Sequence, residues 1–218
     1  MSIKKKIFIV VGLLLLVSLL FPLMSYSYWY IRVIFGDPMW MVKVDDQYRK
    51  LPTQEVVKKL YSIDPFSPYS FSAITVLTER KAPEAVPHLI KITKSIKPSL
   101  RSLAIRSLGE IGDKRAIPRL LEIIEKGEDK NERDYHNALY ALSLLEYEPI
   151  RPLVLERLKR PDGLSNGATT MMKYIGKEED LPLLQELYEN VKGDDTNARI
   201  DRGGLRDAID AIKARAGK

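Results

Sequence analysis

The protein has 218 residues, of which 45% are hydrophobic and 29% charged, with no cysteine and two histidines. This length is typical of one domain, or of one domain with an appendage. The lack of cysteine excludes disulfide frameworks, thiolate zinc sites and thiol nucleophiles, and two histidines far apart in the chain exclude a histidine-rich metal site. The sequence also lacks the motifs of phosphate-binding loops, serine hydrolases and helical zinc sites, so we expect no catalytic residue, cofactor or metal.

The net charge of +6 is concentrated near the N-terminus. Residues 1–50 hold seven Lys/Arg and three Asp/Glu, a net charge of +4, whereas residues 51–218 hold 28 and 26, a net charge of +2. Most of the chain is therefore close to balanced, which gives little support for nucleic-acid binding. We expect no nucleic-acid partner.

An apolar segment with a basic start opens the chain. Lys4, Lys5 and Lys6 precede Ile7–Phe21, in which thirteen of fifteen residues are Ile, Leu, Val or Phe. Residues 7–24 are predicted to form a transmembrane helix, because each such residue favours insertion by about 0.3–0.6 kcal/mol. The positive-inside rule keeps the lysines in the cytoplasm, so the rest of the chain is expected on the other side, in the periplasm or at the cell surface.

A cleaved signal peptide is the alternative interpretation of this segment. The basic start, the apolar core and the small residues Ser25 and Ser27 fit that template, and cleavage near Ser27 would release a secreted protein. Against cleavage, the new N-terminus would be YWYIRVIF, which suits a membrane surface better. We divide the chain into a signal-anchor or signal peptide at 1–27, a juxtamembrane linker at 28–51 and a repeat domain at 52–218.

Two sequence markers recur at the same spacing beyond residue 51. One is a proline within an apolar phrase, at Pro87, Pro118, Pro152 and Pro182. The other is an alanine, at Ala73, Ala104, Ala138 and Ala168. Both sets are spaced by 31, 34 and 30 residues, so the longer second step, which indicates an insertion, occurs in both. This part of the chain is therefore an internal repeat.

Each repeat unit is predicted to form two helices. Apolar residues recur at i, i+3 and i+4 in Ser99–Ile111, Asn137–Leu145 and Gly167–Ile175, as in amphipathic helices. The repeated prolines then open the next helix, where proline is tolerated because the N–H groups of the first turn have no partner within the helix. Gly112 and Gly176 follow helices and are predicted to be left-handed C-caps.

The predicted fold is all-α: an α-solenoid of five helical hairpins preceded by one transmembrane helix. The hairpins are expected at 52–80, 83–112, 114–145, 149–176 and 179–216. Neighbouring hairpins must stack, since neither helix of a pair can bury its apolar stripe alone. In the last pair, the polar stretch 192–204 is expected to form a loop or a frayed helix start.

The phrase SLGEIGDKRAIPRLL at residues 107–121 resembles the signature of short HEAT-like repeats, the variety named from the phycobilisome lyases. Weaker forms of the phrase occur at 77–89, 144–153 and 172–184. The resemblance implies an α-solenoid that usually acts as a protein-interaction scaffold. Some relatives attach or remove bilin chromophores, so it also admits a bilin-lyase-like enzyme or a small-ligand carrier, although no catalytic motif of theirs is matched.

A basic stretch is the first candidate for partner binding. Residues 80–119 hold ten basic and three acidic residues, whereas residues 122–148 hold three basic and eight acidic. The basic stretch fits either an acidic or membrane-associated partner or a solvated face with pairs such as Arg106–Glu110. Its candidate residues are Lys91, Lys94, Lys97, Arg101 and Arg106.

Equivalent positions in the repeats give the second candidate. Second helices of such solenoids commonly line a groove, so a column of equivalent residues forms either a ligand surface or ordinary packing between repeats. One row contains Phe71, Ser102, His136 and Asn166. The row one turn further contains Thr75, Arg106, Tyr140 and Thr170.

Two isolated features have simpler explanations. His88 lies in a first helical turn and is expected at the surface or half-buried. Glu178, Glu179 and Asp180 lie at a predicted helix start, where acidic residues complement the helix dipole, so capping is favoured over metal binding. The sequence as a whole predicts a non-enzymatic, membrane-tethered adaptor that presents its solenoid on the outer side of a bacterial inner membrane and binds another protein.

Overall fold

The computed structural model describes residues 46–62, 68–160, 167–193 and 195–217. The predicted transmembrane segment at residues 7–24 and the cleavage site near Ser27 lie outside these residues. Among the helices of the described part, none combines the length and the apolar character needed to span a bilayer. The helices discussed below belong to the unit Gln47–Lys218.

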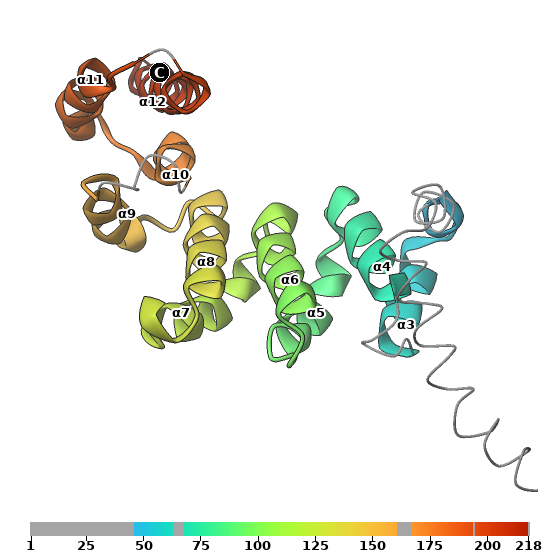
Figure 1. Ribbon diagram of the computed structural model, residues 1–218. Coiled ribbons are helices and arrows are strands. Elements are labelled where there is room, and N and C mark those ends of the chain that lie inside the picture. Colours follow the sequence, from blue (N-terminus) through green and yellow to red (C-terminus); the bar gives the residue numbers. More distant parts are fainter. Residues whose placement is uncertain (1–45, 63–67, 161–166, 194, 218) are drawn as a thin grey trace, which may run out of the picture. The chain divides into compact units, whose positions relative to one another are not determined.

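Regular structure in the described residues is helical and repeats as a hairpin of two helices (Figure 1). The first helices are α3 (Thr53–Ser62), α5 (Val86–Ile92), α7 (Ile117–Glu125), α9 (Arg151–Leu158) and α11 (Leu181–Asn190). The second helices are α4 (Pro68–Glu79), α6 (Pro98–Ile111), α8 (Glu132–Leu144), α10 (Ala168–Ile175) and α12 (Thr196–Ala216). The described residues therefore contain the five predicted hairpins of an α-solenoid.

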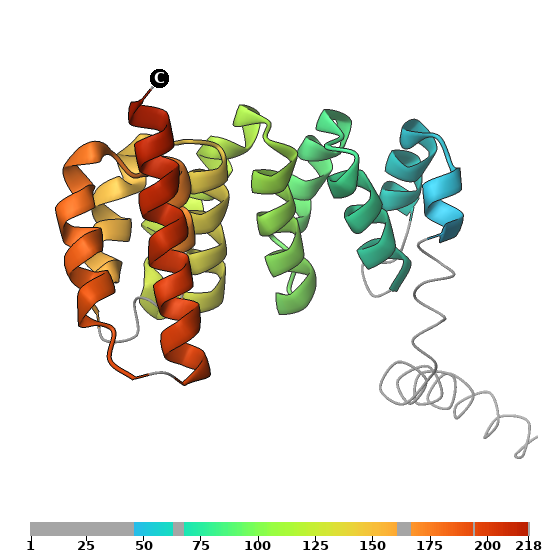
Figure 2. The ribbon, with the colours of Figure 1, turned by 90° about the horizontal axis from the view of Figure 1, so that it is seen from above.

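The second helices form a continuous layer. Helix α4 packs on α6, α6 on α8, α8 on α10 and α10 on α12, and each first helix packs on the second helix of its own hairpin. In Figure 2 the long helix α12 lies in front of α10 and beside α11. The repeated alanines lie within this layer and are fully buried, because a small side chain lets neighbouring helices approach closely. These residues are Ala73, Ala104, Ala138 and Ala168.

The repeated prolines lie in the first turn of α5, α7, α9 and α11, which confirms their predicted role as helix starts. A short 3-10 turn precedes each of these helices. In the turn before α7, Asp113 Oδ1 accepts the backbone N–H of Arg115 at 2.9 Å. In the turn before α11, Asp180 Oδ2 accepts the backbone N–H of Lys177 at 2.8 Å, which confirms the predicted capping role for Asp180.

The two predicted glycine caps differ. Gly112 ends α6 with φ +85°, the left-handed conformation expected of a C-cap. The prediction for Gly176 was wrong, because its φ of −66° and ψ of 148° are extended. A Cβ atom there would lie 2.5 Å from the carbonyl oxygen of Met172 and 2.6 Å from Cδ1 of Ile212 on α12. Glycine occupies this position because the Met172 carbonyl group and α12 together leave no room for a side chain.

The prediction of a loop or frayed start at 192–204 was wrong over most of its length. Helix α12 already begins at Thr196, where Asp195 Oδ1 accepts the N–H of Ala198 at 2.9 Å. A Cβ atom at Gly204 would lie 2.6 Å from Oγ1 of Thr169 on α10. Close packing on α10 therefore stabilises the helical turn around Gly204, although glycine has a low intrinsic helix propensity.

Candidate functional site

A groove with a volume of about 820 Å³ runs over the layer of second helices. We call it the second-helix groove, and it includes three of the residues predicted from the repeat alignment. Its walls come from α4, α6, α8 and α10 and from the turns that follow α4 and α6. They include Thr75, Glu79, Arg106, Glu110, Tyr140 and Tyr174.

Arg106 and Tyr140 are a cationic and an aromatic residue of this groove that lie close together. The predicted ion pair of Arg106 with Glu110 is confirmed, with 3.6 Å between Nη2 and Oε1. Both side chains are exposed, so the pair contributes little stability. The Arg106 guanidinium also lies 5.9 Å from the ring centroid of Tyr140. Burial, together with Tyr174 and Glu110, raises the pKa of Tyr140, so its hydroxyl stays protonated at neutral pH and can donate a hydrogen bond.

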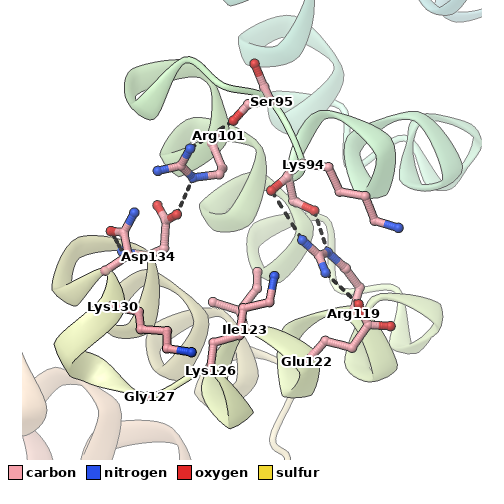
Figure 3. Close-up of a pocket in the computed structure, with 12 residues that line it drawn as sticks. Lys94, Ser95, Arg101, Arg119, Glu122, Ile123, Lys126, Gly127, Lys130 and Asp134 are labelled. Carbon is pink, nitrogen blue, oxygen red and sulfur yellow. Dashed lines mark hydrogen bonds and ion pairs between the residues drawn. The ribbon is translucent and has the colours of Figure 1, made fainter.

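A second cavity, of about 660 Å³, lies between the hairpins α5–α6 and α7–α8 (Figure 3). We call it the inter-hairpin cavity. It is formed by the turn after α5, the side of α6, the helix α7 and the turn that leads into α8. Its lining residues are Thr93, Lys94, Ser95, Arg101, Arg119, Glu122, Ile123, Lys126, Gly127, Lys130, Asn131 and Asp134.

Arg101 joins the two hairpins on one side of this cavity. It forms an ion pair with Asp134 of α8 and donates a 2.8 Å hydrogen bond to the carbonyl oxygen of Ser95. Ser102 donates a further hydrogen bond of 3.2 Å to Asp134. The Asp134 side chain is 8% exposed, so the cluster fixes the Arg101 guanidinium at the cavity wall.

Arg119 joins the hairpins on the other side. It is buried, and its Nε donates a 2.8 Å hydrogen bond to Oγ1 of Thr93 in the preceding hairpin. Its Nη1 lies 2.5 Å from Glu122 Oε2, and this hydrogen bond lowers the pKa of the Glu122 carboxyl. Sequence analysis missed Arg119, although its place directly after the repeated proline Pro118 marks it as a residue of the first turn of α7.

The structure divides the sequence-predicted residues between the two cavities. Lys94 and Arg101 line the inter-hairpin cavity, whereas Arg106 and Tyr140 line the second-helix groove. Ser102 reaches the inter-hairpin cavity only through its hydrogen bond to Asp134.

The other predicted residues lie outside both linings. Lys91 on α5 and Thr170 on α10 are exposed, and Lys97 is half-buried immediately before α6. Asn166 lies outside the described residues. A role for these residues in partner binding stays a prediction.

His136 belongs to a separate ion-pair cluster around Glu128. Its Nε2 lies 2.9 Å from Glu128 Oε1, and Glu128 also pairs with Arg157 of α9 and with Arg160, at 2.7 Å. Ligand atoms of Glu128, Glu132 and His136 lie within 4.8 Å of one another, a spacing that a metal ion tolerates. Because two guanidinium groups already engage the Glu128 carboxylate, we interpret the cluster as a link between α8 and α9 rather than a metal site.

This cluster predicts a pH-dependent contribution to stability. Partial burial raises the pKa of Glu128, but hydrogen bonds from Arg160, His136 and Arg157 outweigh it and lower the pKa from 4.5 to about 2. Since the folded pKa lies below the unfolded one, the stabilisation is fully present above pH 4.5 and is lost as the pH falls towards about 2. Thermal melts of the full chain and of Glu128→Gln should differ most above pH 4.5 and converge on acidification.

Glu132→Gln is the matched control for this titration. Glu132 lies on the adjoining first turn of α8, is exposed and pairs with no guanidinium among the described residues. Its replacement should change the melting temperature above pH 4.5 much less than Glu128→Gln does, because Glu132 is exposed. A gap between wild type and Glu128→Gln that stays constant down to pH 2 would contradict the assignment.

His88 is more buried than expected. The prediction of a surface or half-buried residue was wrong, because the side chain packs inward from α5 and is 9% exposed. Burial, and then the nearby charge of Lys91, lower the pKa of its imidazole. His88 therefore stays neutral at physiological pH as part of the helix packing.

A family comparison agrees with this geometry. Residues 55–134 match the family model of HEAT repeats. This part of the chain is similar to HEAT repeats. The match runs from α3 to the first turn of α8 and confirms the HEAT-like resemblance found in the repeated phrase. It includes every residue that lines the inter-hairpin cavity. HEAT repeats commonly bind other proteins, because stacked repeats present extended surfaces. Comparison with curated proteins gave no match.

Proposed function

We propose that the protein is a non-enzymatic, membrane-tethered adaptor whose HEAT repeats bind a partner protein in the second-helix groove. The groove is the observation that carries this proposal. It places Arg106, Tyr140 and Tyr174 from three successive second helices along one depression of about 820 Å³. Arginine and tyrosine are the residues that most often dominate binding energy at protein interfaces.

The membrane tether is supported by the sequence. Residues 7–24 form the apolar segment, and the lysines before it favour a cytoplasmic N-terminus with the repeats on the outer side of a bacterial inner membrane. Cleavage near Ser27 would instead produce a secreted adaptor with the same groove. We also propose that the repeats are of the phycobilisome-lyase variety, and the support for this is the resemblance of the repeated phrase.

The surroundings of the two histidines support binding rather than catalysis. His88 is buried in the packing of α5, and His136 pairs with Glu128 in the cluster that joins α8 to α9. The groove itself presents two cationic residues, Lys81 and Arg106, with carboxylates and phenol rings, groups that suit a protein surface.

Co-purification in mild detergent tests the proposal. We expect the full-length protein to retain a stoichiometric envelope protein, identified by mass spectrometry, and the double variant Arg106→Ala/Tyr140→Ala to lose it. Truncating two interface anchors should weaken binding by about 2 kcal/mol or more, a factor of roughly 30.

A second arginine–tyrosine pair provides the matched control. Arg206 on α12 lies over the ring of Tyr188 at 5.7 Å and lines neither the second-helix groove nor the inter-hairpin cavity, so Arg206→Ala/Tyr188→Ala should keep the partner. Equal retention by both double variants, or no stoichiometric partner, would contradict the proposal. Visible absorbance of the purified protein, or binding of a titrated bilin, would favour the ligand-carrier alternative instead.

A further inference from the structure

The inter-hairpin cavity is separate from the groove assigned above. We propose that this cavity binds an acidic segment of the partner chain. This inference rests on the proposed function, in which the partner is a protein. The two sites would then recognise different features of one partner, a folded surface in the groove and a run of carboxylates in the cavity.

The charge of the cavity points to an anionic ligand. Its lining holds five cationic residues and two carboxylates, an excess of three positive charges. Both carboxylates already bind arginines, Asp134 to Arg101 and Glu122 to Arg119. Within the described part of the chain, no carboxylate lies at ion-pair distance from the three remaining cations. These cations are the ammonium groups of Lys94, Lys126 and Lys130.

The two arginines are held in place before any ligand arrives. Arg119 is 7% exposed and anchored on Thr93, and Arg101 is anchored on the carbonyl oxygen of Ser95 at 2.8 Å. Fixed guanidinium groups lose little conformational entropy when a carboxylate binds.

Lysines from both hairpins line the cavity (Figure 3). Lys94 extends from the hairpin α5–α6, whereas Lys126 and Lys130 extend from the turn between α7 and α8. Two successive repeats therefore contribute the positive charge, and their cations surround one cavity only when the repeats stack.

The size and lining of the cavity favour a peptide over other anions. A volume of about 660 Å³ falls in the range of about 300–1,000 Å³ that holds ligands of many atoms, which is far more than one phosphate ion fills. Carboxylates spaced along an extended chain can meet cations on both hairpins together. The described lining contains no aromatic ring on which a base could stack, so nucleic acid is disfavoured.

A fluorescent oligoglutamate peptide tests this site on the full chain in mild detergent. We expect it to bind the wild-type protein at low ionic strength and to dissociate as salt is added. Charge reversal in Lys126→Glu/Lys130→Glu should weaken binding about tenfold or more. Both lysines are exposed, so these changes leave the fold intact.

A charge-matched control isolates the site from net charge. Lys192→Glu/Lys213→Glu makes the same charge change at exposed positions of the last hairpin and should leave peptide affinity within about twofold of wild type. Equal weakening by both double variants would overturn the proposal. So would displacement of the peptide by inorganic phosphate or by an oligonucleotide as readily as by unlabelled oligoglutamate.

Failure of this site and failure of the adaptor proposal give different results. If oligoglutamate does not bind while a partner co-purifies and is lost with Arg106→Ala/Tyr140→Ala, the cavity assignment is wrong and the adaptor proposal stands. If oligoglutamate binds through Lys126 and Lys130 but no partner co-purifies, the cavity is a site for acidic peptides, but the adaptor proposal is wrong and the peptide does not belong to its partner.

Discussion

Gly109→Ala is expected to lower the free energy of unfolding by about 2 kcal/mol, although alanine ordinarily favours a helix over glycine by about 1 kcal/mol. Gly109 lies on α6 where this helix meets α8. A Cβ atom at this position would lie 2.5 Å from Cα and 2.7 Å from Cβ of Ala141. Since the nearest atom belongs to the backbone, α6 and α8 must move apart. The layer of second helices then loses packing contacts around this position.

The same substitution at Gly203 is the matched control. Gly203 lies inside α12, and an added Cβ atom would meet nothing within 4 Å. Gly203→Ala should therefore stabilise the protein by about 1 kcal/mol, through helix propensity alone. Thermal melts of the full chain, followed by far-ultraviolet circular dichroism, should shift down by about 4–8 °C for Gly109→Ala and up by about 2–4 °C for Gly203→Ala. Shifts in the same direction would contradict the close approach of α6 and α8.

Arg151→Met is expected to cost about 3 kcal/mol, because it leaves a buried carboxylate without its cation. Asp180 is 4% exposed and receives two hydrogen bonds from Arg151, from Nε to Oδ2 at 2.9 Å and from Nη2 to Oδ1 at 2.6 Å. The pair joins the start of α9 to the start of α11, so its loss weakens the contact between successive repeats. The melting temperature should fall by about 6–12 °C.

Two comparisons make this result specific. Arg151→Met/Asp180→Asn should be more stable than Arg151→Met alone, since it removes the uncompensated charge and leaves a carbonyl oxygen to accept the backbone N–H of Lys177. Glu148→Gln breaks the exposed pair with Lys177, whose side chains are 62% and 45% exposed, and should hardly move the melting temperature. An equal loss in Arg151→Met and Glu148→Gln would show that burial of Asp180 does not matter.

The repeat architecture could be predicted because its determinants are local. Amphipathic spacing, proline in the first helical turn and the paired proline and alanine markers each act within a few residues of the chain. Their common spacing of 31, 34 and 30 residues predicted the hairpins, which the structure contains at those places. The family match to HEAT repeats at residues 55–134 includes the strongest form of the repeated phrase, at 107–121.

The candidate site was only partly predictable from the sequence. Lys94 and Arg101 belong to the basic stretch, but Lys126 and Lys130 belong to residues 122–148, where acidic residues outnumber basic ones eight to three. A count along the chain therefore assigned them to an acidic region. Stacking of the two hairpins brings them to the same cavity as Lys94, because neighbours in space come from different repeats.

The sequence by itself determined that this chain forms stacked helical hairpins, where the helices opened by the repeated prolines begin and that the repeated alanines face inward, since helix formation and amphipathicity depend on neighbours along the chain. Only the tertiary structure decided how closely the helices approach, as at Gly176 beside Ile212, and which charges share a cavity. Both depend on contacts between residues about one repeat apart, and no local pattern contains those distances.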